Sequence, residues 1–427
     1  MGLISWLVEQ HQLLMQQCVL LPFAFLFYFL LTSDFRYLVL SVGGCVLAVF
    51  TMRLYSVLLF IPVFVFILLL SFAPCSVHNW VFGIQMLWQT FWHLFVQYRE
   101  YCSREPVSIR LFLALSSLML LTQRITSLSM DLQEKRVMIT FNASSKRKLC
   151  ETLLPLMSYL LSFTTLLGGP LCSYGQFMSF IQGISHKPPP NTLGVVFLQL
   201  MQVLLLEVIR FCLVCFIKHN VPDPSCAALC DILWVWALGL VLRIQYYSHW
   251  RISECLNNAA GFGFCENSSG DQSGLSDGDF WTTEASSRMS VFSRRWNNTT
   301  ALWLRRLVYR RCKHFPLLMT FGFSLWWHGL HFGHFVGFST WAATVTADYH
   351  VHKYLHPKLS SPWRRVLYNC LGWINTQMIV TCVVLAVEFR NMSGVRLLSV
   401  TPIGLFPLGN ILLLVILLTT SAIVVFR

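Results

Sequence analysis

The sequence predicts an all-α fold, a polytopic bundle of transmembrane helices with about nine to eleven spans and re-entrant segments among them. The chain is 56% hydrophobic and only 11% charged, whereas a soluble domain has roughly 25% charged residues. Its mean hydropathy is +0.60. The apolar runs lack the two-residue alternation of a membrane β-barrel, which leaves helices as the spanning elements.

Apolar runs follow one another along almost the whole chain. A span requires about 20 residues, so the shorter runs are candidates for split or re-entrant helices. We expect a single membrane-embedded domain over residues 1–427, with a polar loop at about 250–313. The candidate runs are residues 13–31, 38–50, 56–73, 77–96, 111–122, 153–171, 193–216, 229–244, 315–345, 366–389 and 397–426.

The net charge of +13 reflects 31 Lys and Arg residues against 18 Asp and Glu. In a membrane protein this excess first indicates basic cytosolic loops. No long soluble basic region is present to bind nucleic acid, so we expect membrane lipid and no nucleic acid as a partner. Residues 288–313 contain eight basic and no acidic residues, which predicts a cytosolic location and no glycan at the sequon of Asn298.

The stretch "SLWWHGLHFGHF" (residues 324–335) places three histidines in an apolar run. Ionisable groups at membrane depth are costly and usually face a cavity or pathway. His328 is the strongest candidate, because it lies in an otherwise uncharged Trp-Trp-His-Gly sequence. The alternative is a histidine in an interfacial aromatic belt, hydrogen-bonded to a neighbouring helix. We expect His331 and His334 to be polar residues near the membrane interface.

Metal binding is a minority interpretation of these histidines. His350, His352 and His356 form a second group, but ligands must converge in space and need supporting contacts. No two histidines are adjacent anywhere in the chain, so we expect no metal. The one Gly-x-Ser-x-Gly match, "GLSDG" at residues 274–278, lies in the acidic, Gly/Ser-rich stretch of the polar loop and not in an apolar run, so we do not interpret it as a nucleophile motif. An enzyme with this sequence would therefore use a histidine base on a hydroxyl that its substrate supplies, and the near-neutral pKa of histidine suits that task.

Four segments together resemble the membrane-bound O-acyltransferases. "SLWWHGLHFGHFVGF" (324–338) resembles the histidine motif of that family, and "SRRWNNTTALWLRRLVYR" (293–310) resembles its asparagine motif. Asn297 and His328 are 31 positions apart. "YYSHWRISECLNNAAGFGF" (246–264) and "LMLLTQRITSLSMD" (118–131) resemble two earlier segments. Each motif alone is weak, but the set in this order is specific.

The resemblance implies a multi-pass enzyme of the endoplasmic reticulum membrane. It is greatest to the members that acylate the peptide hormone ghrelin, and it extends over nearly the whole chain. It implies transfer of a medium-chain acyl group, octanoyl above all, from acyl-CoA to a serine hydroxyl of that hormone. Acyl-CoA would be a co-substrate, and no cofactor is expected. By the same resemblance, His328 is the catalytic base and Asn297 its partner.

The side chains near these two residues suggest further roles. The Asn297 amide is a candidate donor to the oxyanion or to the thioester, and the alternative is a helix N-cap. Arg294 and Arg295 are candidates for binding the phosphates of coenzyme A, or else lipid headgroups. Phe321 and Trp341 are candidates for the far end of an acyl pocket, and the alternative is packing alone.

Three other functions remain open from the sequence. A polytopic transporter could use His328 as an intramembrane proton site. A lipid acyltransferase of the same family would carry the same motifs but a different acceptor. A non-catalytic lipid or peptide binder with the same fold would not depend on His328.

Overall fold

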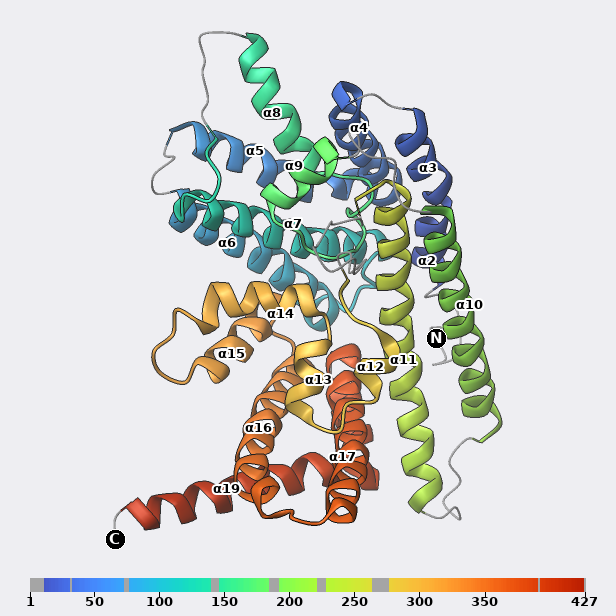
Figure 1. Ribbon diagram of the computed structural model, residues 1–427, viewed down its shortest axis with the longest axis vertical. Coiled ribbons are helices and arrows are strands. Elements are labelled where there is room, and N and C mark those ends of the chain that lie inside the picture. Colours follow the sequence, from blue (N-terminus) through green and yellow to red (C-terminus); the bar gives the residue numbers. More distant parts are fainter. Residues whose placement is uncertain are drawn as a thin grey trace. The chain divides into compact units, whose positions relative to one another are not determined.

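The computed structural model describes residues 11–30, 33–72, 77–139, 146–183, 192–220, 228–262, 276–390 and 392–425. Every regular element in these ranges is helical (Figure 1), which confirms the all-α class. Contacts within the chain group into two units. Unit 1 comprises Met1–Leu204 and Ser248–Asp277, and unit 2 comprises Leu205–Tyr247 and Gly278–Arg427. The predicted single membrane-embedded domain stays a prediction.

Unit 1 is built around α7 (Ile109–Gln133), whose residues 121–131 are all buried, the polar side chains of Gln123, Arg124 and Asp131 included. Its first turn is capped by Ser108, whose hydroxyl accepts a hydrogen bond from the Arg110 amide. α7 packs against α4, α5, α6 and α8. The helices of this unit are α2 (His11–Val19), α3 (Leu21–Leu30), α4 (Ser33–Met52), α5 (Val57–Phe72), α6 (Val77–Gln97), α7 (Ile109–Gln133), α8 (Lys146–Leu160), α9 (Tyr174–Gly183) and the first part of α10 (Thr192–His219).

Unit 2 is centred on α16, which packs against α15, α17 and α19. Helix α11 (Ala228–Ala259) begins in this unit and ends in unit 1. The remaining elements are α12 (Phe280–Glu284), α13 (Met289–Arg295), α14 (Asn298–Leu304), the π-helical turn η3 (Arg305–Tyr309), α15 (Pro316–His328), α16 (Phe332–Leu355), α17 (Pro362–Phe389), α18 (Met392–Val400) and α19 (Leu405–Val425).

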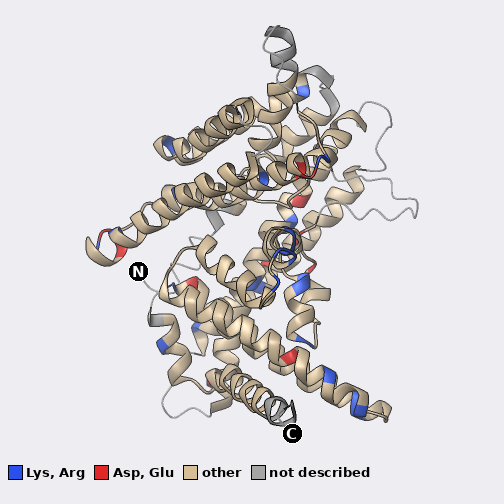
Figure 2. Ribbon diagram, turned by 90° about the vertical axis from the view of Figure 1, so that its left-hand side faces the viewer, with Lys and Arg blue, Asp and Glu red and all other residues tan. Residues whose placement is uncertain are grey.

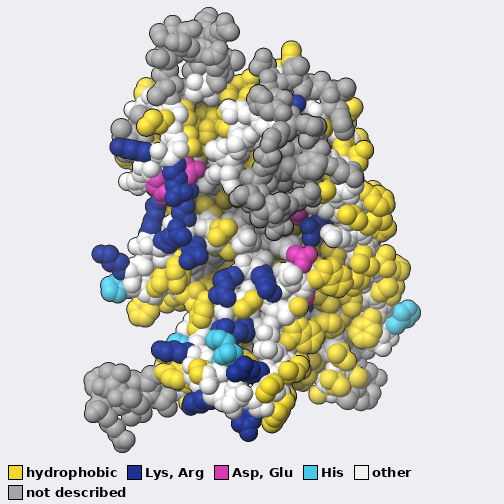
Figure 3. Space-filling model, in the orientation of Figure 1, with side chains coloured by type: hydrophobic (Ala, Val, Ile, Leu, Met, Phe, Trp, Pro, Cys, Tyr) yellow, Lys and Arg dark blue, Asp and Glu magenta, His cyan; other side chains and the backbone are white. Residues whose placement is uncertain are grey.

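Six helical stretches in the described residues are long and apolar enough to cross a membrane. Long helical segments carry no charged side chain at all (Figure 2), and large hydrophobic side chains are widely exposed (Figure 3), as expected of a surface that faces lipid. Six is fewer than the expected nine to eleven for three reasons: two predicted runs join into one stretch, others form short helices, and α6 is long enough but not apolar enough. The six are Phe35–Phe72, Ile109–Gln133, Thr192–His219, Ala228–Ala259, Pro362–Phe389 and Pro402–Thr419.

Two segments have a different secondary structure from the one that the sequence predicts. The apolar run 315–345 is not one helix, because the chain breaks between α15 and α16. The segment expected as a polar loop at about 250–313 contains helices over much of its length. Residues 250–259 continue α11, and short helices begin at residue 280. The short helices form because the rings of Phe292 and Trp303 are buried and pack these helices against the rest of unit 2. Residues 263–275 lie outside the described ranges.

A glycine permits the close contact of α4 with the end of α8. A Cβ atom added at Gly44 would lie 1.4 Å from the backbone oxygen of Leu161, far inside van der Waals contact. Gly83, on α6, has nothing within 4 Å of the same position. The two glycines therefore have different reasons to be present, although both lie inside helices.

We expect Gly44→Ala to lower the thermal stability of unit 1, because the backbone of residue 161 must move to admit the methyl group. Overpacking of this kind costs about 1–3 kcal/mol. Gly83→Ala is the matched control and should be neutral or stabilising, since alanine favours helix by roughly 1 kcal/mol. Thermal unfolding of the purified protein in detergent measures both. Equal melting temperatures for the two variants would contradict this account of the α4–α8 contact.

Candidate active site

The histidine motif forms a bend between two helices. α15 ends at His328, and Gly329 follows with φ 98° and ψ 144°, a conformation that favours glycine. His331 is in extended conformation and precedes the first residue of α16. The backbone N–H of His331 donates to the Gly329 oxygen at 2.9 Å and closes the bend. Gly329 therefore lets the chain turn immediately after the candidate base.

The bend brings His328, His331 and His334 together. The ring centroids of His331 and His334 are 5.1 Å apart, and those of His328 and His334 are 6.2 Å apart. His334 Nδ1–H donates to the Gly329 oxygen at 2.7 Å, so its ring supports the bend. His331 and His334 are only 3% and 5% exposed, so both rings lie in the protein interior, and their position relative to the membrane interface stays a prediction. His328 is half-buried, as a base that must reach a substrate requires.

No three His, Cys, Asp or Glu side chains in the described part of the chain are placed to hold a metal ion. His350, His352 and His356, the second histidine group, lie at the other end of α16 and in the turn that follows it. His350 is occupied within its own helix, where Nδ1–H donates to the Thr346 oxygen at 2.9 Å. The two histidine groups therefore lie at opposite ends of α16.

A row of aromatic rings extends from His328. The imidazole stacks on Phe338 with centroids 5.0 Å apart, and Phe338 stacks on Trp341 at 6.4 Å. Trp341 in turn contacts Phe321 at 5.8 Å. The structure thus brings together the two predicted acyl-pocket residues and adds Phe338 between them and the histidine. Phe335, which a continuous helix would place on the same face, is instead 57% exposed.

Asn297 lies between α13 and α14 in an unusual backbone conformation. Its φ of 45° and ψ of 58° are left-handed, a region in which asparagine is several-fold enriched. Asn297 occupies the N-cap position of α14, but its side chain does not cap the helix. The N-cap interpretation of this side chain is therefore wrong. In the described residues the amide makes no hydrogen bond, and it is partly exposed, so it is available to a substrate.

The residue before Asn297 is held by aromatic packing. Trp296 stacks on Phe292, with centroids 5.6 Å apart. It also contacts Tyr246 and Tyr247 of α11 edge to face, at 5.7 and 5.3 Å. Such contacts each add about 0.5–1.5 kcal/mol beyond burial. These rings fix the left-handed residue relative to α11.

The residues on either side of Asn297 are also tied to the histidine bend. Trp341 Nε1–H donates to Ser293 Oγ of α13 at 2.6 Å. Trp303 of α14 packs against Trp327, the neighbour of His328, with centroids 5.2 Å apart. The asparagine segment and the histidine bend are thereby parts of one packed arrangement within unit 2.

Arg294 and Arg295 project from the last turn of α13 and are exposed. Arg294 NH1 donates to the Tyr349 hydroxyl at 3.2 Å. Arg295 NH1 donates to the Thr282 backbone oxygen and to Ser286 Oγ, the latter at 3.3 Å. Within the described ranges neither guanidinium is paired with a carboxylate, so both retain positive charge for an anionic group. Arg295 also connects α13 to α12, a role that the sequence did not predict.

A buried ion pair holds α12 in place. Arg243 of α11 is fully buried, and its Nε lies 3.0 Å from Glu284 Oε1. Its other two nitrogens donate to Thr381 Oγ1 at 3.0 Å and Gln377 Oε1 at 2.8 Å, both on α17. Tyr247 donates to Glu284 Oε1 at 3.0 Å. Each charge therefore has a partner and further hydrogen bonds, the condition under which a buried pair is tolerated.

The start of α13 is held by a second ion pair. Arg288 makes a two-pronged contact with Asp348 of α16, at 3.2 and 3.1 Å. The backbone N–H of Ser290 also donates to Asp348 Oδ2 at 3.2 Å. The carboxylate thus satisfies an otherwise unpaired amide at a helix N-terminus, where negative charge is favourable. Neither ion pair could be predicted from a local sequence pattern, because the partners are far apart in the chain.

Comparison with known proteins shows the family. Residues 107–386, which include both Asn297 and His328, match the membrane-bound O-acyltransferase family. The chain belongs to that family. It is thus a membrane O-acyltransferase, as the motifs predicted. It is 41% identical to the membrane-bound ghrelin O-acyltransferase of Mus musculus, over 95% of this chain and 96% of that protein.

Other relatives are similar over different lengths. The membrane-bound ghrelin O-acyltransferase of Rattus norvegicus is 40% identical over 95% of this chain and 96% of its own. The membrane-bound glycerophospholipid O-acyltransferase 2 of Homo sapiens is 30% identical, over 62% of this chain and 56% of its own length.

We expect Glu284→Gln to destabilise the enzyme strongly, because it leaves the fully buried Arg243 without a counter-charge. Breaking such a pair costs about 3–5 kcal/mol. Glu105→Gln is the matched control, since Glu105 pairs with Arg99 while its own side chain is 59% exposed, and exposed pairs contribute about 0–1 kcal/mol. Thermal unfolding in detergent compares the two variants. A Glu284→Gln protein as stable as the control would show that the network does not support α12.

Proposed function

We propose that this enzyme transfers a medium-chain acyl group, octanoyl, from acyl-CoA to a serine hydroxyl of the peptide hormone ghrelin. The observation that carries the proposal is the extent of the similarity. Identity to the two ghrelin O-acyltransferases is 41% and 40% over 95% of the chain. Identity to glycerophospholipid O-acyltransferases 1 and 2 is 25–30%, over 62–84% of the chain.

In this proposal, His328 is the general base. A serine hydroxyl is a weak nucleophile until a base takes its proton, which neutral imidazole can do as the oxygen attacks the thioester carbon. The tetrahedral intermediate then collapses, the C–S bond breaks, and the coenzyme A thiolate takes a proton from the imidazolium. The products are the serine ester and coenzyme A thiol, and His328 is regenerated. Its half-buried position and its stacking on Phe338 support this role.

Asn297 is the proposed hydrogen-bond donor to the acyl carbonyl. Its amide has no partner in the described residues, and packing on both sides holds its left-handed backbone. A fixed donor of this kind stabilises negative charge as it develops on oxygen, which is typically worth about 2.7–4 kcal/mol. The exposed Arg294 and Arg295 are the proposed contacts of the coenzyme A phosphates, for which an arginine fork is well suited.

We further propose that the enzyme resides in the endoplasmic reticulum membrane, with residues 288–313 facing the cytosolic pool of acyl-CoA. The eight basic residues of this segment support that side. The proposal needs no cofactor, because the thioester supplies the activated acyl group. A lipid acyltransferase is the nearest alternative, and the acceptor distinguishes it. A transporter would show no product formation from acyl-CoA at all.

The first test concerns His328. We expect His328→Ala to lower octanoyl transfer by roughly 10²- to 10⁴-fold, the range ascribed to a positioned base, while the protein accumulates normally. His219→Ala, an exposed histidine at the end of α10, is the control and should retain full activity. The assay combines purified enzyme, octanoyl-CoA and ghrelin peptide. Lysophospholipid replaces the peptide in one arm, and a peptide without the acceptor serine in another.

Acylation of lysophospholipid in place of the peptide would overturn the proposed acceptor and leave the family assignment intact. Full activity of His328→Ala on either acceptor would overturn the proposed base. His334→Ala should lower activity less than His328→Ala does, because His334 supports the bend through the Gly329 oxygen but lies in the interior.

The aromatic row supports a proposal for chain-length selection. A tail that extends from a thioester beside His328 would follow Phe338 toward Trp341 and Phe321. Each buried methylene contributes about 0.8 kcal/mol, so longer chains are favoured until a rigid ring blocks them. Trp341 is rigid here because Ser293 accepts its indole hydrogen bond.

We expect Phe321→Ala or Trp341→Ala to shift preference from octanoyl toward longer donors more than either lowers total activity. Trp341→Phe removes the bond to Ser293 but keeps a ring, and therefore separates loss of anchoring from loss of bulk. Phe335→Ala, which truncates an exposed ring of the same helix, should leave the profile unchanged. A competition assay with acyl-CoA donors of six to fourteen carbons measures the chain-length preference of each variant. If the two Ala variants keep the octanoyl optimum, the pocket ends on another helix.

A further inference from the structure

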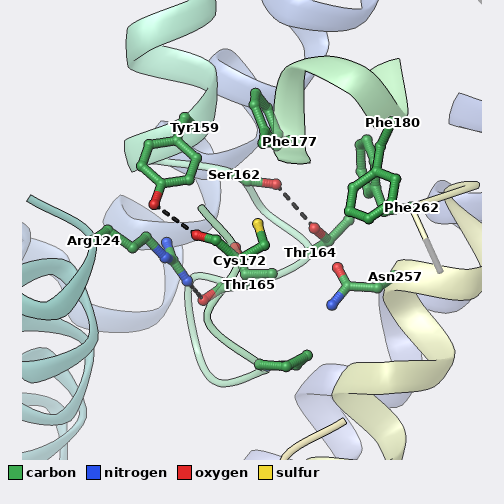
Figure 4. Close-up of a pocket in the computed structure, with 11 residues that line it drawn as sticks. Arg124, Tyr159, Ser162, Thr164, Thr165, Cys172, Phe177, Phe180, Asn257 and Phe262 are labelled. Carbon is green, nitrogen blue, oxygen red and sulfur yellow. Dashed lines mark hydrogen bonds between the residues drawn. The ribbon is translucent and has the colours of Figure 1, made fainter. Parts of the chain in front are cut away.

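Unit 1 contains a small cavity that the proposed reaction does not use (Figure 4). Its volume is about 20 Å³, more than the roughly 10–15 Å³ that a water-sized group needs. It lies between α7, the segment that follows α8, α9 and the end of α11. Its lining combines a cation, several uncharged polar groups and aromatic rings, and each contributes differently.

The cation is Arg124 of α7. Its side chain is buried, with 6% exposed, inside a helix that is apolar enough to cross the membrane. NH1 donates to the Leu160 oxygen at 3.1 Å, and NH2 donates to the Thr165 oxygen. Both acceptors are neutral, and no carboxylate of the described residues pairs with this guanidinium. A buried charge without a counter-charge is costly, and in membranes it usually marks a site.

Uncharged donors line the same cavity. The side-chain amide of Asn257 makes no hydrogen bond to the described residues, although the residue is only 4% exposed. Figure 4 shows it projecting from α11 toward Thr164 and Thr165. Ser162 and Thr164 hydroxyls share one hydrogen bond at 2.9 Å, so one of their two protons remains for another acceptor. A buried amide without a partner costs about 1–3 kcal/mol, which an acceptor in the cavity would recover.

The rest of the wall is apolar. Phe177 and Phe180 come from α9 and Phe262 follows α11, and all three rings are buried. Phe177 and Phe262 are 5.9 Å apart between centroids. A purely inorganic anion would gain nothing from these rings. An anionic head attached to a hydrocarbon tail would use the donors and the rings together.

We propose that this cavity binds the carboxylate of a fatty acid. Arg124 supplies the counter-charge, the Asn257 amide and a Ser162 or Thr164 hydroxyl donate to the carboxylate oxygens, and the phenyl rings border the first methylenes of the tail. A planar carboxylate fits a guanidinium fork, and the small volume favours it over a bulkier phosphate. The inference does not depend on the identity of the acyl acceptor, because it concerns a separate site in unit 1.

The test measures thermal stabilisation of the purified full-length enzyme in neutral detergent by decanoate and by decan-1-ol. The alcohol has the same tail and no charge. We expect decanoate to raise the unfolding temperature in a saturable manner and decan-1-ol to raise it little. Arg124→Gln should weaken the apparent affinity for decanoate by about tenfold or more, the size of one charged hydrogen bond. Arg110→Gln changes an exposed arginine of the same helix and should leave the affinity unchanged.

Asn257→Asp covers the case in which Arg124→Gln fails to fold, because Arg124 also holds the Leu160 and Thr165 carbonyls. It keeps the side-chain shape and places a permanent carboxylate beside Arg124. This variant should fold and lose the response to decanoate. An undiminished response in Asn257→Asp or Arg124→Gln would place the ligand elsewhere, the acyl pocket included, and overturn the proposal. Equal stabilisation by decan-1-ol would exclude charge recognition, and equal stabilisation by decyl phosphate would overturn the choice of a carboxylate.

Discussion

The ion pair of Arg243 with Glu284 is the constraint on which the active-site half of the molecule depends. Arg243 is fully buried on α11, and Glu284 ends the short helix α12. A helix of five residues has little stability of its own. Gln377 of α17 donates to the Glu284 carboxylate at 2.9 Å and to its backbone oxygen at 3.0 Å. One carboxylate thus joins three helices and sets where α13, and after it Asn297, begins.

The site built on this anchor is rigid before any substrate arrives. Left-handed backbone at a residue other than glycine costs of order 1–3 kcal/mol and persists only where the surroundings determine it. At Asn297 the surroundings are Trp296 on one side and Trp303 on the other, both packed among aromatic rings. In return, the Asn297 side-chain amide is left without a hydrogen bond to any of the described residues. Preorganised donors need no rearrangement when charge develops on a reacting oxygen, which is the main source of their effect.

Sequence patterns predicted the fold class and the motif residues, and physical limits explain what they missed. Hydropathy measures the transfer of side chains into lipid, so it predicted the apolar spans. It could not predict the helix break at Gly329, because that break depends on the backbone conformation of one residue. An uninterrupted helix would place Phe335, seven residues on, beside His328, whereas the break puts Phe338 there. Phe321 and Trp341 were predicted as acyl-pocket residues, but the contact between their rings across the bend could not be predicted. Pairing between charges that are distant in the chain leaves no local sequence pattern, so the Arg243 network could not be predicted.

Burying a charged guanidinium is costly, and the two buried arginines, Arg243 and Arg124, meet that cost in different ways. Arg243 meets Glu284 and two further side-chain acceptors on α17. Among the described residues, Arg124 donates only to neutral carbonyls, and it lies beside a cavity that is also lined by Asn257, whose amide those residues leave without a hydrogen bond. If Arg124 served packing alone, a neutral side chain of similar size would fill the space at lower cost, since replacing buried charge with apolar groups is often stabilising. The complete Arg243 network therefore has a structural role. In the incomplete network of Arg124, a ligand supplies the missing negative charge.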